Sequence, residues 1–234
     1  KSKVISLDNQ NSIIKKLEFS LTNDQTKTLT EINKDLSSTK KMFRLLQGDV
    51  GSGKTIVALI TSLNVIFSNF QVCLMAPTEI LAKQHYNLTK KLFPKDIEVE
   101  LLTGKTDYSC RKKIINNLEN NKIKMIIGTH SLFQEKIKYH NLGLIIIDEQ
   151  HKFGVKQRKK LSDKGGKNCD VLVMSATPIP RTMMMTIYGD MDISLIKSKP
   201  RNRRPIKTYS KNETKINDVI NFIKSEIIKK NQVF

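Results

Sequence analysis

The residues with the clearest chemical purpose form an unbroken G-x-x-x-x-G-K-T sequence at positions 48–55. Its glycines allow positive φ angles, which turn successive backbone N–H groups inward toward a bound phosphate. The Lys54 ammonium adds a positive charge for the β- and γ-phosphates, and the Thr55 hydroxyl is a ligand for Mg²⁺. The alternative is a glycine-rich turn that binds nothing, which would make the Lys-Thr pair a coincidence. We predict ATP and Mg²⁺ as cofactors, held by Gly48, Gly51, Ser52, Gly53, Lys54 and Thr55.

Two carboxylates follow an apolar run at 144–147, where a buried strand is expected to end. Asp148 at the strand tip can hold Mg²⁺ through water, and Glu149 can polarise the water that attacks the γ-phosphate. Gln150 and His151 follow on the γ-phosphate side, where they can contact the nucleotide and couple its state to the next strand. The alternative is a pair of acids that caps the following helix.

Hydroxyl residues follow another expected strand, at 170–175. The side chains of Ser175 and Thr177 can bond the Asp-Glu segment and so sense hydrolysis. Ser and Thr at such positions more often cap a helix, which is the alternative. We predict a coupling role for both residues, together with Gln150.

These residues need a scaffold, and strand-like and helix-like segments alternate from about residue 42 onward. Several apolar runs are continuous, as expected for parallel strands covered on both faces. The predicted fold is α/β, a parallel sheet with helices on both faces, and ligands gather at the carboxyl ends of such strands. Strands are predicted at 42–47, 71–76, 97–102, 123–128, 143–148 and 170–175. Helices are predicted at 54–68, 78–93, 107–121, 155–162 and 180–187.

The flanking segments differ in character from the alternating region. Upstream, we expect a short helix that carries Ile13, Leu17 and Phe19, then a helix capped by Thr22 or Asn23 that runs to about residue 36. Downstream, a basic stretch bracketed by prolines has no periodicity and is typical of a linker. The predicted layout is a helical lead-in at 1–40, an ATP-binding domain at 41–196, a linker at 197–205 and a truncated second domain at 206–234.

The last segment contains too little for a domain of its own. We expect a strand at 206–209 and a helix within 212–230, where Ile216, Val219 and Ile223 recur at helical spacing. A strand, a helix and a cut strand do not enclose a core. The chain is therefore expected to be a fragment whose second lobe is almost entirely missing.

The composition narrows the class of partner. The net charge of the 234 residues is +19, which suits a polyanion, and nucleic acid is the first candidate. The alternative is biased codon usage, because Asn and Ile are abundant beside Lys. No apolar run approaches the roughly 20 residues of a membrane span, so we expect a cytoplasmic protein with no membrane partner. The three cysteines are far apart and suggest neither a metal site nor a disulfide.

Taken together, the motifs resemble those of superfamily 2 helicases in order and spacing. The segments that carry the resemblance are 48–55, 76–79, 103–104, 128–130, 148–151 and 175–177. The resemblance is closer still to the RecG family of bacterial ATP-dependent DNA helicases, and it runs from about Phe19 to the last residue. It implies a RecA-like motor lobe that, in the intact protein, remodels forks and Holliday junctions in DNA repair and recombination.

The resemblance also implies further site residues. Gln25 matches the glutamine that reads adenine, and a plain polar helix residue is the alternative. Five positions match residues that grip the backbone of one DNA strand, although each is also suited to a helix cap or a turn. They are Thr78, Thr103, Gly104, Thr129 and His130. Arg181 is either a further phosphate contact or a solvated charge.

Two departures limit what the resemblance implies. Asn202 stands where the family's linker has glycine, and asparagine tolerates a positive φ better than most residues. The second lobe with its arginine finger, and the wedge domain that engages the branch point, are not in the sequence. Such a finger contributes on the order of 10³–10⁵ in turnover, so the chain is expected to bind ATP and hydrolyse it poorly. The alternatives are a transcription-repair coupling translocase, whose family has Asp-Glu-Glu at 148–150, and a nucleotide- and DNA-binding module without efficient hydrolysis.

Overall fold

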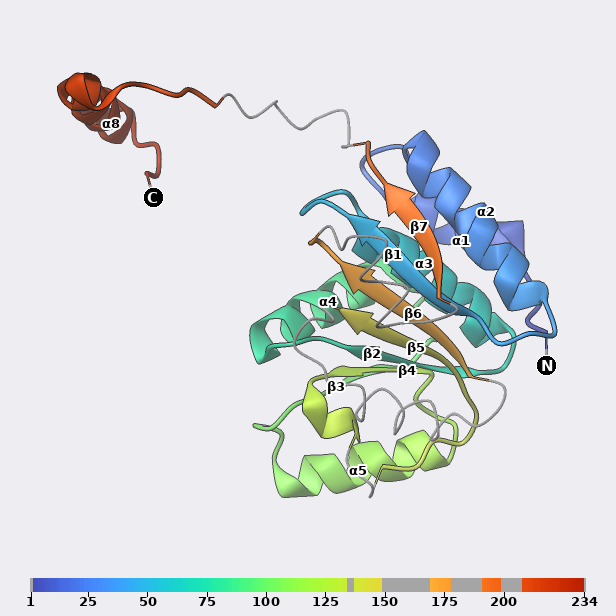
Figure 1. The fold of residues 1–234 in the computed structure, drawn as a ribbon. Helices are drawn as coiled ribbons and strands as arrows, with labels where there is room; N and C mark the ends of the chain where they lie inside the picture. The colour runs from blue at the N-terminus through green and yellow to red at the C-terminus, as the bar shows by residue number, and fades with distance from the viewer. Residues whose placement is uncertain (1, 134–136, 149–168, 178–190, 199–207, 234) are drawn as a thin grey trace. The chain divides into compact units, whose positions relative to one another are not determined.

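The chain folds into two compact units, residues Lys1–Arg201 and Asn202–Phe234, in a computed structural model (Figure 1). The described residues are 2–133, 137–148, 169–177, 191–198 and 208–233. Most of the predicted linker, the helices predicted at 155–162 and 180–187, and Asn202 lie outside them.

A seven-stranded sheet forms the centre of the first unit, in the order β3-β4-β2-β5-β6-β1-β7. Every pair of neighbouring strands is parallel, which confirms the predicted α/β architecture. The strands are β1 (Phe43–Gly48), β2 (Gln71–Met75), β3 (Val99–Leu102), β4 (Met125–Gly128), β5 (Leu142–Asp148), β6 (Asp170–Ser175) and β7 (Asp192–Ile196). The six strands predicted between residues 42 and 175 are all present, within two residues of the predicted bounds.

The edge strand β7 was not predicted. Its residues alternate between exposed and buried, and its first residue, Asp192, is exposed, so the segment lacks the continuous apolar run of the inner strands. Strand β7 pairs with β1, where Arg44 is buried. The guanidinium of Arg44 donates to Asp35 Oδ2 at 2.7 Å and to Ser194 Oγ at 2.9 Å, which ties β1 to α2 and β7.

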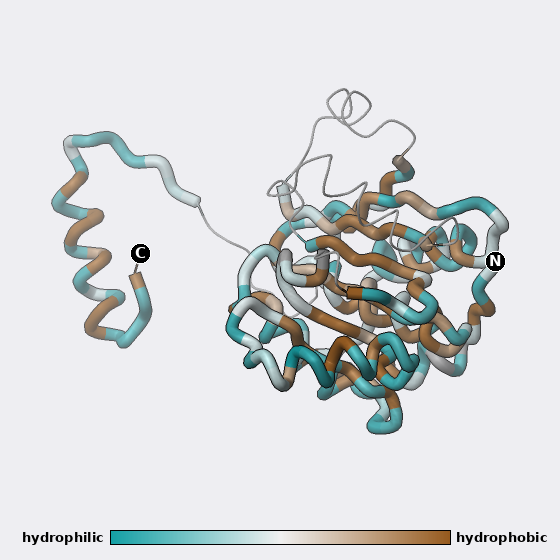
Figure 2. Tube along the Cα trace, turned by 90° about the horizontal axis from the view of Figure 1, so that it is seen from below, coloured by the Kyte–Doolittle hydropathy of each residue, from teal (hydrophilic) through white to brown (hydrophobic). Residues whose placement is uncertain are grey.

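Successive strand residues point to opposite sides of the sheet, so the continuous apolar strands make both faces hydrophobic. Helices cover both faces. In β2, Leu74 belongs to a core that also contains residues of α2, α3 and α4, whereas Cys73 belongs to a second core with Leu118 of α5. Figure 1 shows the helices around the sheet, and Figure 2 shows hydrophobic segments along the strands. The helices of the first unit are α1 (Leu7–Ile14), α2 (Asn23–Ser37), α3 (Lys54–Phe67), α4 (Glu79–Leu92), α5 (Tyr108–Glu119) and the short η1 (His130–Phe133). The helices predicted at 54–68, 78–93 and 107–121 are confirmed.

The N-terminal lead-in packs on the same sheet unit. Helix α2 begins as predicted, with the Thr22 hydroxyl accepting from the backbone of Gln25 in a capping box. The short helix expected at Ile13 to Phe19 was placed too late, because α1 ends at Ile14. Just after α1, Lys16 Nζ donates to Leu92 O at 2.9 Å, which links this segment to the end of α4.

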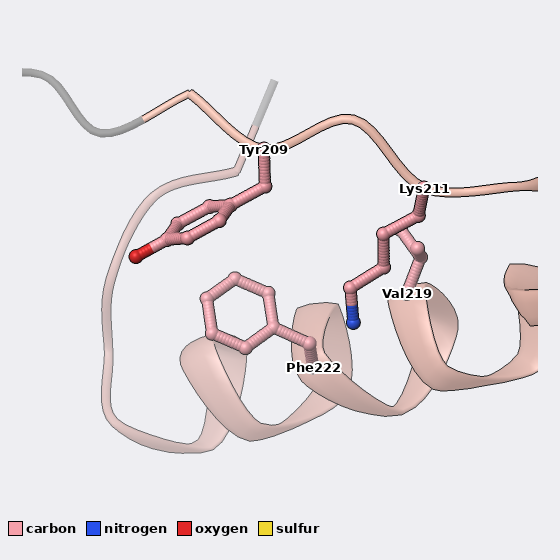
Figure 3. Close-up of a pocket in the computed structure, with 4 residues that line it drawn as sticks. All are labelled: Tyr209, Lys211, Val219 and Phe222. Atoms are coloured by element: carbon pink, nitrogen blue, oxygen red, sulfur yellow. The ribbon is translucent and has the colours of Figure 1, made fainter.

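The second unit holds η4 (Glu213–Lys215) and α8 (Ile216–Ile228), in agreement with the helix predicted there. Residues 208 and 209 are not in a strand, and the described part of this unit offers no strand to pair with. Among the described residues, four side chains on and before α8 line a hollow of 760 Å³, with the Tyr209 ring near the Phe222 ring (Figure 3). They are Tyr209, Lys211, Val219 and Phe222.

Candidate nucleotide and nucleic-acid site

The predicted nucleotide residues meet at the carboxyl edge of the sheet. Strands β1, β6 and β5 are neighbours, with Gln47 opposite Ser175 and Asp148 opposite Met174. The loop after β1, the acid at the end of β5 and the hydroxyl at the end of β6 therefore lie side by side. This is the edge where parallel α/β sheets bind ligands.

Glycine is required at two positions of the phosphate loop. Gly53 has a φ of 87°, and a Cβ added there would collide with the Gln25 side chain. A Cβ on Gly48 would lie 2.6 Å from Ser52 Oγ. Gly51 also has a positive φ, of 76°. The loop is thus a tight backbone cradle that side chains would fill.

Lys54 is buried at the first position of α3, where the helix dipole favours an anion. Its Nζ donates to Gly48 O at 2.7 Å and to Asp49 O at 3.2 Å, so the ammonium is held within the loop. Thr55 follows in the first helical turn. The Ser52 hydroxyl is buried and has no hydrogen-bond partner among the described residues. A phosphate in the loop would therefore meet a positive charge and the N-terminal N–H groups of a helix.

Gln25 has a role that the sequence did not reveal. It is fully buried, its Nε2 donates to Ser52 O at 2.8 Å, and its Oε1 accepts from Thr22 N at 2.8 Å. The side chain thus braces the phosphate loop against the start of α2. These two contacts use one donor and one acceptor of the amide, and the predicted reading of adenine stays a prediction. A hollow of 550 Å³ lies nearby, lined by residues of 14–21 and by Thr26.

Asp24, next to Gln25, holds the residues that follow β7. Its Oδ2 accepts from Ser198 N at 2.8 Å and from Lys197 N at 2.9 Å. The hydrogen bonds from Ser198, followed by that from Lys197, lower the pKa of this carboxyl below its usual value. The start of the predicted linker is therefore fastened beside the phosphate-loop brace.

Asp148 has an unexpected partner in His85 of α4. The two side chains are buried, and His85 Nε2 lies 2.8 Å from Asp148 Oδ2. The periodicity of α4 contained a signal for this contact, since His85 lies on the inward face with Ala82, Thr89 and Leu92. A histidine in such a stripe is polar and buried, and it requires a partner.

Ser175 and Thr177 bond each other at the end of β6. Their hydroxyl oxygens are 3.0 Å apart, and Thr177 N donates to Ser175 Oγ at 3.2 Å. Gln47 Nε2 donates to Thr177 O at 3.1 Å, which connects the triplet to the strand before the phosphate loop. The predicted bond from this triplet to the Asp-Glu segment stays a prediction.

The residues predicted to grip DNA lie on the other half of the same edge, after β2, β3 and β4. The exposed Thr78 caps α4 by accepting from Leu81 N at 3.3 Å. Thr103 is buried and its hydroxyl accepts from Lys105 N at 3.3 Å, which shapes the turn at the exposed Gly104. Lys105 Nζ lies 3.5 Å from Glu79 Oε2, so the loops after β2 and β3 are adjacent.

The remaining predicted residues are placed only in part. Thr129 is half-buried after β4, and His130 begins η1. Glu149, Gln150, His151 and Arg181 lie outside the described residues. Thr78 and Thr103 form the local cap and turn bonds given as alternatives, and a hydroxyl in such a bond can still contact a phosphate.

Comparison with known proteins identifies the family. Residues 22–186 match the DEAD/DEAH box helicase family. The chain belongs to this family.

Several relatives of this chain are RecG helicases. The chain is 49% identical to the ATP-dependent DNA helicase RecG of Thermotoga maritima, over 94% of this chain and 28% of the relative. It is 45% identical to RecG of Borreliella burgdorferi, over 99% of this chain and 34% of the relative. The chain thus spans about a third of the length of these relatives. The predicted resemblance to RecG is confirmed.

Solved structures agree with this assignment. A structure of RecG bound to a three-way DNA junction superimposes with a TM-score of 0.86 and 43% identity, covering 97% of this chain and 31% of that chain. The DEAD-box helicase Mss116, bound to single-stranded RNA, has a TM-score of 0.67 at 19% identity and shows the shared fold alone.

The described part of this DEAD/DEAH box domain has no cluster of three or more His, Cys, Asp or Glu side chains that could hold a metal ion. That is compatible with Mg²⁺, which binds through one or two protein oxygens together with phosphates and water. None of the described helices is long and apolar enough to cross a membrane.

Proposed function

We propose that this chain is the ATP-binding motor lobe of a DNA helicase that, in the intact protein, acts on branched DNA such as forks and Holliday junctions. One observation carries the proposal. The phosphate loop, the acid at the end of β5 and the hydroxyl pair at the end of β6 lie together on one half of the carboxyl edge of the parallel sheet. The loops with the predicted backbone grip lie on the other half.

At the nucleotide, the proposed roles follow from the chemistry of each group. Lys54 and the N–H groups at the start of α3 bind the phosphates. Thr55 and Asp148 would hold Mg²⁺, which neutralises charge on the phosphate oxygens when bound. Glu149 is the proposed base that orients water. Gln25 holds the loop and reads adenine, and His151 contacts the nucleotide.

At the DNA, the proposed contacts are with the backbone. Hydroxyl and N–H groups at strand ends bind phosphates without reading bases, and the net charge of +19 favours such contacts. The proposed residues are Thr78, Thr103, Gly104, Thr129, His130 and Arg181. Gln150, Ser175 and Thr177 would couple the two ligands. RecG bound to a three-way junction supports DNA as the partner.

The first experiment is titration of this chain with a fluorescent ATP analogue, beside an assay of ATP hydrolysis with and without forked DNA. We expect Mg²⁺-dependent binding with little turnover, because the arginine that stabilises the transition state is proposed to come from a second lobe. Lys54→Ala should weaken binding at least about tenfold, through loss of a charged contact to phosphate.

Two results would contradict this proposal. Absence of nucleotide binding would refute the assignment of the phosphate loop. Robust turnover stimulated by DNA would mean that the catalytic arginine comes from this chain or from a second copy of it.

A further inference from the structure

The contact between His85 and Asp148 joins helix α4 to the end of strand β5, and the two residues are 63 positions apart in the sequence. His85 Nε2 and Asp148 Oδ2 are 2.8 Å apart, and both side chains are buried, with exposed fractions of 9% and 11%. A polar contact in so dry a position is stronger than one on the surface.

The sheet order explains why these two residues meet. Strands β2 and β5 are neighbours, and Met75 near the end of β2 lies opposite Ile147 in β5. The chain turns after β2, passes the exposed Thr78 and enters α4, whose inward face carries His85 back over the end of β5. A single helix therefore begins at a proposed DNA contact and, within two turns, reaches the proposed metal ligand.

The chemistry fixes the direction of the hydrogen bond. A carboxylate that binds a metal is ionised and only accepts hydrogen bonds. His85 must then carry its hydrogen on Nε2 and donate it to Oδ2. This bond engages Oδ2 and fixes the plane of the carboxylate, so that Oδ1 would be the oxygen left to serve a metal ion.

We propose that His85 is a positioning residue that orients Asp148 for Mg²⁺. The inference rests on the proposed function, because it assumes that Asp148 serves a metal-bound nucleotide. Groups that orient metal ligands in this way typically change metal affinity by about 10- to 100-fold when they are removed. A histidine that only fills space between α4 and β5 would affect stability and leave the metal dependence unchanged.

The test measures nucleotide binding by the whole chain rather than its activity. A fluorescent ATP analogue is titrated at a series of Mg²⁺ concentrations and in excess chelator, for the wild type, His85→Phe and His85→Gln. For His85→Phe we expect unchanged affinity in chelator, and a Mg²⁺ concentration for half-maximal enhancement that rises by about 10- to 100-fold. His85→Gln retains an N–H donor and should recover part of this loss.

Two further variants serve as references. Thr89→Val is the matched control, since Thr89 is buried on the same face of α4 and its hydroxyl donates to His85 O rather than to Asp148. It should bind with the wild-type Mg²⁺ dependence. Asp148→Asn should lose most of that dependence. If His85→Phe does not fold, as judged by its melting curve, His85→Met replaces it with a flexible apolar side chain that fills the same space.

The outcomes separate the two proposals. If the wild type binds no nucleotide, the proposed function fails and this inference fails with it. If the wild type binds with Mg²⁺ enhancement and the donor-free variants show the same enhancement, His85 is a packing residue and only this inference is overturned. Full Mg²⁺ dependence in Asp148→Asn would also overturn it, because Asp148 would then not serve the metal.

Discussion

The two halves of the carboxyl edge are built differently. In the half proposed to bind nucleotide, formed by the loops after β1, β5 and β6, Gln25, Ser52 and Lys54 are buried. Gln25 donates to the backbone carbonyl of Ser52, and Lys54 donates to that of Gly48. In the DNA half, formed by the loops after β2, β3 and β4, Thr78 and Gly104 are exposed and Lys105 retains 87% of its side-chain exposure.

The difference follows from what each half would bind. A buried, pre-formed cradle binds phosphate without paying for reorganisation at each turnover. An open row of hydroxyl and backbone groups suits a ligand that is bound through its backbone, as proposed for DNA. Substitutions in the nucleotide half should therefore reduce stability and nucleotide affinity together, whereas those in the DNA half should leave nucleotide affinity unchanged.

The largest effect is expected for Gly53→Ala. The alanine would have to adopt the positive φ of Gly53, and its Cβ would collide with the Gln25 side chain. A non-glycine residue in such a conformation costs about 1–3 kcal/mol, to which the collision adds. We expect a lower free energy of unfolding and loss of binding of the ATP analogue, measured by denaturant unfolding and by titration.

Gly104→Ala is the matched control in the DNA half. A Cβ there would lie 3.4 Å from Glu79 Oε1, which is an ordinary contact, and this glycine has no positive φ. Its stability and nucleotide affinity should equal those of the wild type. Equal damage from the two substitutions would remove the distinction between the halves.

An intermediate effect is expected for Gln25→Ala. The change leaves the buried carbonyl of Ser52 without its donor and removes one half of the capping box of α2. An unsatisfied buried polar group costs about 1–3 kcal/mol. Unfolding should occur at lower denaturant concentration, and the affinity for the ATP analogue should fall in the same variant.

Thr78→Ala gives the comparison for this variant. It also removes a helix cap, which costs about 1 kcal/mol, but Thr78 lies in the DNA half and is exposed. Its nucleotide affinity should be unchanged. If Gln25→Ala lost stability and kept full nucleotide affinity, the bond to Ser52 would be structural only.

The sequence was sufficient for those parts of the fold that depend on local pattern. Continuous apolar runs predicted the inner strands, such as β5, because strands buried on both faces need no polar residues. The phosphate loop was predicted because its glycine and lysine spacing is contiguous. Strand β7 was missed because an edge strand has one exposed face and a mixed composition.

The long-range contacts of the site could not be predicted in this way. His85 meets Asp148 only because β2 and β5 are neighbours, and the order of strands is not written in any local pattern. Gln25 was identified as a candidate for adenine, and its bond to Ser52 depends on the packing of α2 beside the phosphate loop. Such contacts require the register of the whole sheet.

The smallest effect is expected for Lys105→Ala, which tests the DNA half directly. Lys105 Nζ and Glu79 Oε2 are 3.5 Å apart at the surface. Surface ion pairs contribute little to stability, so the melting temperature should not change. If Lys105 contacts a DNA phosphate, its removal should reduce the slope of log affinity against log salt concentration by about 1. The affinity should fall equally for all DNA sequences. Lys34→Ala, an exposed lysine in the last turn of α2, is the control and should leave the slope unchanged. Equal slopes for the wild type and Lys105→Ala would make Lys105 an ordinary solvated charge, and the DNA would then be held by other groups of this edge.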